Sequence, residues 1–302
     1  MKKVLLTFTA FVAWMPFLAA QDALPFTRID RNPVTSAFAG AGAASNGTAA
    51  YSAFGGAAML PFYNGTLDAA VSYQRWSPAL SLSNNVSVGA AYKITPRVGL
   101  SLGYTLENGA SYDVYEGPGA PSGKFYPKNH VIALGFGAGI TDFVSVGLNV
   151  RYAREIPAPG AMHDGFNADL FAGFQLNEGL RLTAGVSTLG TLVEKTWKQP
   201  ASLKVAVDWA PLMTGNHVLD IMADADYYFS GSFSAAAGLQ YTWKQLLFVR
   251  AGYRYAPEAS VIPRHLALGL GVQFYGLRLD VSYLTASSTL GNTLNLGLAY
   301  SF

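Results

Sequence analysis

The sequence predicts an all-β fold, a transmembrane antiparallel β-barrel of about fourteen strands that follows a plug-like N-terminal segment. Three observations predict it. Apolar residues alternate with small or polar ones over most of the chain, short connections alternate with long ones, and no segment of the mature chain is apolar over the roughly eighteen residues that a membrane helix needs. A barrel accounts for all three, because each of its strands needs only one apolar face.

The composition excludes several classes of protein. Hydrophobic residues make up 51% of the 302 residues and charged residues only 13%, against about 25% in ordinary soluble domains. The net charge of +2 gives no electrostatic reason to expect a nucleic-acid partner. The absence of cysteine excludes a disulfide framework, a thiolate metal site and a lipidated N-terminal cysteine. We expect no cofactor and no bound metal.

The first residues have the pattern of a secretory signal peptide. Lys2 and Lys3 precede an apolar run over 4–18, and Ala19-Ala20 offers a cleavage point. The alternative, a first transmembrane helix, fits less well because the run is short and no basic residues follow it. The predicted organisation is a signal peptide at 1–20, a plug or brace segment at 21–66 and a barrel at 67–302.

The C-terminal residues form the clearest predicted strand. Leu294, Leu296, Leu298, Tyr300 and Phe302 alternate with small or polar residues, so that one face is wholly apolar. A terminal aromatic strand of this kind resembles the signal by which outer-membrane barrels are recognised for insertion. Tyr300 and Phe302 are therefore the predicted insertion signal, and the barrel-insertion machinery is a predicted partner.

The same alternation predicts the upstream strands. In the strand at 219–227, Asp220, Asp224 and Asp226 lie on the face opposite the apolar residues. The other predicted strands are at 67–75, 86–94, 97–106, 129–140, 143–154, 165–176, 180–189, 200–209, 233–243, 247–255, 266–274 and 277–283.

The connections are an independent check on these strands. A barrel with an even strand number has both chain ends and its short turns on the periplasmic side, and longer loops outside. The sequence keeps this order with two exceptions, since 210–217 is long for a periplasmic turn and 229–232 is short for an outer loop. The predicted long outer loops are 76–85, 107–128, 155–164, 190–200, 256–264 and 286–292.

Aromatic residues gather near the predicted strand ends, where a membrane barrel has its interfacial girdles. A secreted β-sandwich is the competing fold, but its outward faces would carry many Lys and Glu, whereas the polar faces here are mostly Gly, Ala, Ser and Asn. We therefore expect a barrel integral to a bacterial outer membrane and surrounded by its lipid. The predicted girdle residues are Tyr73, Trp76, Tyr104, Tyr152, Trp209, Tyr227, Tyr228 and Trp243.

Residues 22–66 do not alternate. Their Ala, Gly and Ser make them too apolar for a solvated tail and too glycine-rich for a good helix. We expect them to fold into the lumen as a plug, and a loosely attached periplasmic arm is the alternative. The plug residues singled out are Asn32, Pro33, Gly40, Gly42, Tyr51, Gly55 and Gly56.

Three short motifs in this segment carry a family resemblance. They are Arg31-Asn32-Pro33, the Ala/Gly run at 39–44 and Ala49-Ala50-Tyr51. The pattern resembles PorV/PorQ-type proteins, within the broader family of FadL-like outer-membrane barrels. That family has an Asn-Pro-Ala turn next, whereas this chain has Phe54-Gly55-Gly56-Ala57-Ala58, which puts the family's hatch mechanism in doubt.

The resemblance implies fourteen strands and two different roles. FadL-like members carry hydrophobic small molecules, so the expected partner is a hydrophobic small-molecule ligand. PorV/PorQ-type members serve type IX-like secretion or surface assemblies without transporting, so the expected partner is a secretion or surface-complex protein. Gly and Ala on the lumen faces favour a pocket, while the N-terminal motif favours the partner role.

Charged residues on the predicted lumen faces form the candidate polar site. Unpaired charges in a narrow, low-dielectric lumen are costly, so we expect these groups to pair into a ladder. A polar pathway, or a calcium ion held by the aspartates of 219–227, is the alternative. The cluster is Asp220, Asp224, Asp226, Arg250, Arg254, Arg278 and Asp280, with Arg151, Asp169 and Asp208 on other strands.

Lipid hydrolysis is a remote alternative, because a hydrolase needs a nucleophile and a base within hydrogen-bonding distance at the membrane rim. The histidines are His130, His163, His217 and His265, and the sequence has no Gly-x-Ser-x-Gly motif. We therefore predict no catalytic residues and a protein that is not an enzyme.

The longest predicted outer loop is rich in Gly and Pro and carries four aromatic residues: Tyr112, Tyr115, Phe125 and Tyr126. Exposed aromatic residues on a loop favour a contact surface for a partner or ligand, and a lid over the barrel mouth is the alternative.

Overall fold

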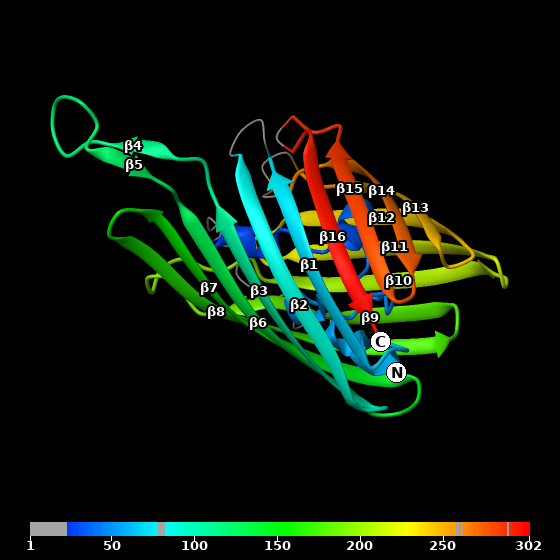
Figure 1. Ribbon diagram of the computed structural model, residues 1–302. Coiled ribbons are helices and arrows are strands. Elements are labelled where there is room, and N and C mark those ends of the chain that lie inside the picture. Colours follow the sequence, from blue (N-terminus) through cyan, green and yellow to red (C-terminus); the bar gives the residue numbers. More distant parts are fainter. Residues whose placement is uncertain (1–22, 78–81, 258–259, 261, 289) are drawn as a thin grey trace.

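Fourteen strands close into an antiparallel barrel in the computed structural model, which describes residues 23–302 apart from 78–81, 258–259, 261 and 289 (Figure 1). The predicted signal peptide at 1–20 lies outside the described residues. The barrel strands are β1 (Leu67–Trp76), β2 (Ser83–Thr95), β3 (Val98–Asn108), β6 (Lys128–Gly139), β7 (Val144–Ala158), β8 (Ala161–Asn177), β9 (Leu180–Gly190), β10 (Ser202–Met213), β11 (His217–Tyr228), β12 (Phe233–Trp243), β13 (Leu247–Tyr255), β14 (His265–Phe274), β15 (Leu277–Thr285) and β16 (Thr293–Ser301).

The pairing of β1 with β16 closes the barrel. Its register runs from Asp68 opposite Ser301 to Arg75 opposite Leu294, and the amide of Leu67 donates to the carbonyl of Phe302 at 2.9 Å. The remaining strands each pair with the next barrel strand in sequence. The predicted all-β fold and its fourteen strands are confirmed.

Alternating residues give each strand an apolar outer face and a polar inner face. In β13, Val249 and Tyr253 are 52% and 47% exposed, whereas Arg250 and Arg254 are 2% and 6% exposed. Because the strands form a closed ring, the exposed apolar side chains together cover its outer surface, as the hydrocarbon core of a membrane requires. No helix among the described residues is long and apolar enough to span a membrane.

The predicted aromatic girdle is wrong at two positions. Trp209 and Trp243 are exposed on the outer face, but Trp76 and Tyr228 are buried and line the lumen. Each of these two is the last residue of its strand, and the strand's period of two turns it inward. The alternation of side chains along the strand, and not the distance of a residue from the strand end, decides whether that residue faces the lipid or the lumen.

The predicted long turn at 210–217 is wrong, because β10 continues to Met213 and only 214–216 separate it from β11. The register shifts between Trp209 and Leu212, around Pro211. Proline has no amide to donate to the sheet, so it occurs at such bulges, and the bulge breaks the alternation on which the prediction depended. The short outer connection at 229–232 is confirmed.

The predicted outer loop at 155–164 is also wrong, because these residues extend β7 and β8. The two strands are joined by 159–160, where Gly160 has a φ of 74°. A register shift between Glu155 and Ala158 again breaks the alternation, and the prolines nearby gave the sequence the appearance of a loop. In Figure 1 the paired ends of β7 and β8 extend to the left of the barrel, and we call this extended part of the barrel mouth the high rim.

A small hairpin occupies the longest outer connection. β4 (Tyr112–Val114) pairs with β5 (Gly123–Phe125) and projects away from the barrel mouth (Figure 1). The rings of Tyr112 and Phe125 are 5.7 Å apart, and the Tyr112 hydroxyl donates to the carbonyl of Pro157 at 2.8 Å. The hairpin thus continues the high rim above β7.

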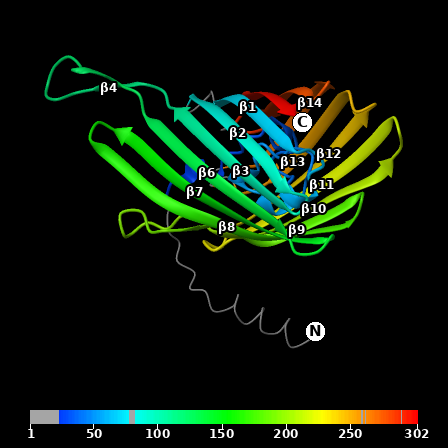
Figure 2. The ribbon, with the colours of Figure 1, turned by 60° about the horizontal axis from the view of Figure 1, so that its bottom comes forward.

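Residues 23–66 lie within the ring of strands, where Figure 2 shows them as blue coils. The Asn32 side chain accepts from the amide of Val34 at 3.0 Å and caps α2, which Pro33 begins. The segment starts near the outer loops, where the amide of Ala23 donates to the carbonyl of Lys198, and ends beside the periplasmic turns. Its helices are η1 (Pro25–Arg28), α2 (Pro33–Ala37), η2 (Ser52–Phe54) and η3 (Ala57–Phe62).

Candidate functional site: the lumen and its internal segment

Inward-facing glycines let residues 23–66, which we call the internal segment, approach the barrel wall. A side chain at Gly147 would overlap Ala58, and one at Gly252 would overlap Phe38, which is fully buried. The small residues on the lumen faces were expected to leave a pocket. That interpretation is wrong at these positions, because the internal segment fills the space.

Two barrel carboxylates bind consecutive amides of the internal segment. Asp224 of β11 accepts from the amides of residues 42–43 at 2.9 and 3.2 Å. Asp68 of β1 accepts from the amides of residues 49–50 at 2.6 and 2.9 Å. Hydrogen bonds to an ionised acceptor are stronger than neutral ones. We call Asp68 and Asp224 the clasp carboxylates.

Barrel side chains also donate to carbonyls of the internal segment. The Asn149 amide donates to the carbonyls of residues 52–53 at 2.6 and 3.0 Å, and the Ser145 hydroxyl to that of Ala58 at 2.5 Å. Buried main-chain groups need such partners. The sequence analysis missed Asp68, Ser145 and Asn149. All three are polar and occupy lumen-facing places in the alternating strand pattern, so the sequence carried a signal for them.

Most of the predicted charge cluster forms one hydrogen-bonded chain across β11–β15. Asp280 accepts from Arg250 at 2.6 Å and from Arg278 at 2.7 Å. Gln240 accepts from Arg250 at 2.7 Å and donates to Asp220 at 2.9 Å. Each charged group therefore has a polar partner, as a charge inside a barrel requires.

Two of the predicted aspartates, Asp224 and Asp226 of β11, lie beside a lysine that the sequence analysis did not single out, whereas Asp208 pairs with Arg181 at 2.9 Å. Lys204 of β10 lies 3.8 Å from Asp224 and 3.5 Å from Asp226, and Arg254 lies 3.7 Å from Asp226. The ammonium of Lys204 occupies the place that a calcium ion was suggested to take. The described residues hold no group of three or more acidic or histidine side chains suited to a metal ion.

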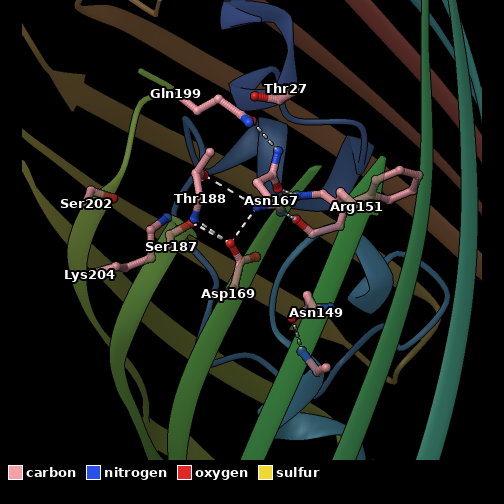
Figure 3. A network of polar contacts seen from close by, with 12 residues as sticks. Thr27, Asn149, Arg151, Asn167, Asp169, Ser187, Thr188, Gln199, Ser202 and Lys204 are labelled. Carbon is pink, nitrogen blue, oxygen red and sulfur yellow. Dashed lines mark hydrogen bonds and ion pairs between the residues drawn. The ribbon is translucent and has the colours of Figure 1, made fainter. Parts of the chain in front are cut away.

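A third polar cluster surrounds Asp169 of β8 (Figure 3). Asp169 pairs with Arg151 and accepts from the Ser187 hydroxyl at 3.1 Å and from the Thr188 amide at 2.7 Å. A register shift at 168–170 and a φ of 57° at Thr188 bring these two neighbours onto one carboxylate. The bulge thus brings the Ser187 and Thr188 donors onto the same carboxylate oxygen, Oδ1, that Arg151 contacts, while Oδ2 of Asp169 is buried without a hydrogen-bond partner among the described residues.

Apolar side chains of the internal segment, the wall and the outer loops pack together at the outer mouth. Leu24, Phe26 and Ile29 of the internal segment are buried against inward residues of the upper barrel wall and against outer loops. We call this group the mouth cluster. Its barrel and loop members are Trp76, Val131, Ala153, Val193, Ile262, Ala267, Leu284 and Leu290, with Ala39 and the partly buried Ala23 and Phe54 from the segment.

A cavity of about 210 Å³ lies between the internal segment and the wall. Both clusters around Asp169 and Lys204 face it, and so do the predicted plug residues Tyr51, Gly55 and Gly56. The charged residues that line the cavity are Arg28, Asp30, Arg31, Arg151, Asp169, Lys204, Asp224, Asp226 and Arg254.

Two charged residues of the internal segment lie deep beside this cavity. Burial raises the pKa of Asp30 and lowers the pKa of Arg31 to about 10. Arg31 stays charged at neutral pH, and it donates to the carbonyl of Phe26 at 2.8 Å and to the Thr105 hydroxyl at 3.2 Å. Arg31 thereby joins the start of the internal segment to β3.

The remaining predicted residues are spread over the molecule. Gly40 and Gly42 have φ values of 89° and 129°, and a side chain at Gly40 would meet the Arg254 guanidinium. Tyr115 and Tyr126 are exposed on the high rim, and Tyr300 and Phe302 are exposed at the periplasmic end. The four histidines each contact a group other than a serine hydroxyl: His130 with Tyr104, His163 with Glu194, His217 with Tyr241 and His265 with Pro263.

This geometry defines an integral outer-membrane β-barrel whose lumen is occupied by its own N-terminal segment. No protein-family model matches the sequence, and no curated protein matches it. Among solved structures, the toluene transporter TbuX from Ralstonia pickettii shares the fold with a TM-score of 0.61 and 13% identity, over 89% of this chain and 97% of that one.

Two more solved structures share the fold. The CymD monoaromatic hydrocarbon channel has a TM-score of 0.62 and 12% identity, over 90% of this chain and 97% of its own. A FadL homologue from Pseudomonas aeruginosa has a TM-score of 0.50 and 12% identity, over 89% and 95%. The likeness confirms the outer-membrane β-barrel fold, and the FadL-like family and the PorV/PorQ subtype stay predictions.

Proposed function

We propose that the protein is a gated passage for small hydrophobic molecules across the outer membrane, and that the internal segment is the gate. The observation that carries the proposal is a lumen closed by a segment that side chains of the wall hold through its main chain. A cavity beside the segment offers room for a molecule in transit. The shared fold with structures named as a toluene transporter and a monoaromatic hydrocarbon channel supports this class of cargo.

The hydrogen bonds that hold the internal segment are individually weak enough for the segment to move. An intramolecular hydrogen bond contributes only about 0.5–1.5 kcal/mol net, and up to about 3 kcal/mol when one partner is charged. Several such bonds can break in groups without unfolding the barrel, because parts of a protein open locally at a lower free energy than the whole. The closed ring of strands persists while the segment shifts.

A disulfide that locks the internal segment tests the proposal. The chain has no cysteine, and the Cβ of Pro61 lies 3.5 Å from the position that a Cβ on Gly139 would take, within the range for a disulfide. We expect the oxidised variant Pro61→Cys with Gly139→Cys to take up radiolabelled ethylbenzene several-fold more slowly than its reduced form. The assay uses cells with an intact outer membrane, because ethylbenzene crosses a simple lipid bilayer unaided.

The matched control joins two positions of the wall instead. The Cβ of Ala210 lies 3.6 Å from the position that a Cβ on Gly179 would take. The variant Gly179→Cys with Ala210→Cys therefore forms a disulfide that leaves the internal segment free. Uptake through this control should not depend on oxidation. Equal uptake by the locked and unlocked segment would contradict the gate.

A second function, non-transporting partner of a type IX-like secretion or surface complex, is favoured by one observation. The β4–β5 hairpin projects from the high rim with Tyr115 exposed beside it, as a protein contact surface would. Native mass spectrometry of the protein extracted from its own membrane separates the two. A stoichiometric partner polypeptide on an otherwise empty barrel supports the partner role, and a bound small molecule without partner chains supports passage.

A further inference from the structure

We propose that the lumen cavity takes an amphipathic molecule whose polar group has no net charge, such as an alcohol, in preference to a plain hydrocarbon or an ion. This inference rests on the proposed passage and names the chemical class of its cargo. It follows from the distribution of apolar and charged groups around the cavity.

The apolar lining of the cavity is concentrated on one side. Ile29, Phe54, Trp76, Ile262 and Leu284 all line the cavity, and all belong to or pack on the mouth cluster. On the barrel wall the polar lining lies on β7–β11, β13 and β14, mostly around Asp169 and Lys204, and the internal segment adds polar residues that include Arg28, Asp30 and Arg31. A molecule in the cavity can therefore contact the apolar groups of the mouth cluster and hydrogen-bonding groups of the wall at the same time.

The charges on the polar side compensate one another. Arg151 pairs with Asp169, and Lys204 and Arg254 together face Asp224 and Asp226. Each group thus sums to zero formal charge. An ionic ligand would bring a charge into this space with no free counter-charge on either cluster, which is unfavourable in a buried site.

The charges of the internal segment are engaged as well. Arg31 donates to the main-chain carbonyls of Thr27 and Phe26 at 3.1 and 2.8 Å and to the Thr105 hydroxyl at 3.2 Å. Arg28 stacks over the ring of Tyr228, with its guanidinium carbon 3.9 Å from the ring centroid. These contacts hold both cations to groups of the protein.

Hydroxyl groups beside the compensated charges suit a neutral polar ligand. Ser187, Thr188 and Ser202 line the cavity next to Asp169 and Asp226. An alcohol can donate to and accept from such groups without adding charge. A plain hydrocarbon would desolvate the same charged groups and replace none of their hydrogen bonds with water, which costs free energy.

The cavity is large enough for such a molecule. A single water needs roughly 10–15 Å³ of free space, and the cavity offers about 210 Å³. A phenyl ring with a short polar arm is a suitable probe, because the ring can contact the mouth cluster while the arm points to Asp169 or Lys204.

Four probes with one ring and different arms test the inference. They are 2-phenylethanol, ethylbenzene, phenylacetate and 2-phenylethylamine, titrated calorimetrically into the full-length protein in lipid nanodiscs, with empty nanodiscs subtracted. We expect 2-phenylethanol to bind about tenfold more tightly than the other three. Ala43→Phe, which fills the cavity, should abolish this binding, and Ala110→Phe on the exposed outer loop is the matched control.

Two charge variants test the compensation directly. Asp226→Asn leaves the cations Lys204 and Arg254 in excess and should raise the relative affinity for phenylacetate about tenfold. Lys204→Gln leaves Asp224 and Asp226 in excess over the remaining cation and should raise the relative affinity for 2-phenylethylamine about tenfold. Each variant is first checked for a folded barrel by its heat-dependent electrophoretic mobility, and either one alone suffices to show the shift.

The outcomes separate this inference from the proposed passage. Tightest binding of ethylbenzene, or affinities that do not change in the charge variants, would overturn the amphipathic cargo while the disulfide lock still reports on the gate. Absence of binding by all four probes also overturns it. If the locked segment carries ethylbenzene as fast as the free one, the gate fails whatever the binding preference is.

Discussion

The outer and inner faces of the barrel wall obey different rules, as two neighbouring residues of β7 show. Leu148 points outward and is 42% exposed, while Gly147 beside it faces Ala58 so closely that no side chain fits. The outer face needs apolar character and little else, because lipid adapts to its shape. The inner face must match one particular segment of the same chain, so its residues are fixed individually by shape and hydrogen bonding.

The largest difference between the faces is expected at this pair. Gly147→Leu forces a side chain into the space of Ala58 and should lower the free energy of unfolding by about 3 kcal/mol, or expel the internal segment. Leu148→Ala removes only lipid-facing surface and should cost about 1 kcal/mol. Urea unfolding of both variants in lipid vesicles measures this, and equal losses would contradict the comparison.

The clasp at Asp224 should give the next largest effect. Asp224→Ala removes the acceptor of two amides and one of the two aspartates near Lys204, so we expect a loss of about 2 kcal/mol. The same unfolding measurement applies, together with faster proteolysis of residues 40–50 from the periplasmic side. A variant as resistant to protease as the wild type would mean that this contact does not hold the segment.

A milder change at the other clasp sharpens the comparison. Asp68→Asn keeps one acceptor oxygen but loses the charge that strengthens the bonds to residues 49–50. We expect a loss of about 1 kcal/mol, smaller than at Asp224, because no buried cation is left without its partner. Equal losses at both clasps would show that Lys204 does not depend on Asp224.

The outer face and the inner face also differed in how far the sequence predicted them. The period of two revealed the strands and their apolar face, because this signal lies within each strand. Lys204 and the wall glycines could not be assigned a role, since their partners lie far away in sequence. Asp68 and Asn149 had the right parity, but only the path of the internal segment shows which main-chain groups they bind.

The bulges set a further limit on prediction. Pro211 and the register shift at 155–158 interrupt the alternation, so that strand ends there looked like loops. The bulge opposite Asp169 escaped notice for another reason: its extra residue lies in β9, where Ser187 and Thr188 both face Asp169, while the alternation of β8 continues unbroken. The bulge places Ser187 and Thr188 on the carboxylate of Asp169. This arrangement depends on how β8 pairs with β9 and cannot be read from either strand alone.

The smallest effect is expected at an exposed pair on the periplasmic rim, outside both faces. Arg97 donates to Asp142 at 2.5 Å, but both side chains are largely exposed to solvent, which weakens the pair. Arg97→Ala should change the free energy of unfolding by less than about 0.5 kcal/mol. A loss as large as that of Asp68→Asn would show that the rim contributes as much as the lumen.

The most direct test of the central claim, that the internal segment closes the lumen, is the conductance of single barrels in a planar lipid bilayer. The wild type should stay almost entirely non-conducting. The double variant Asp68→Ala with Asp224→Ala, which removes both clasp carboxylates, should show frequent open steps while its electrophoretic mobility still reports a folded barrel. Equal conductance of the two proteins would contradict the account.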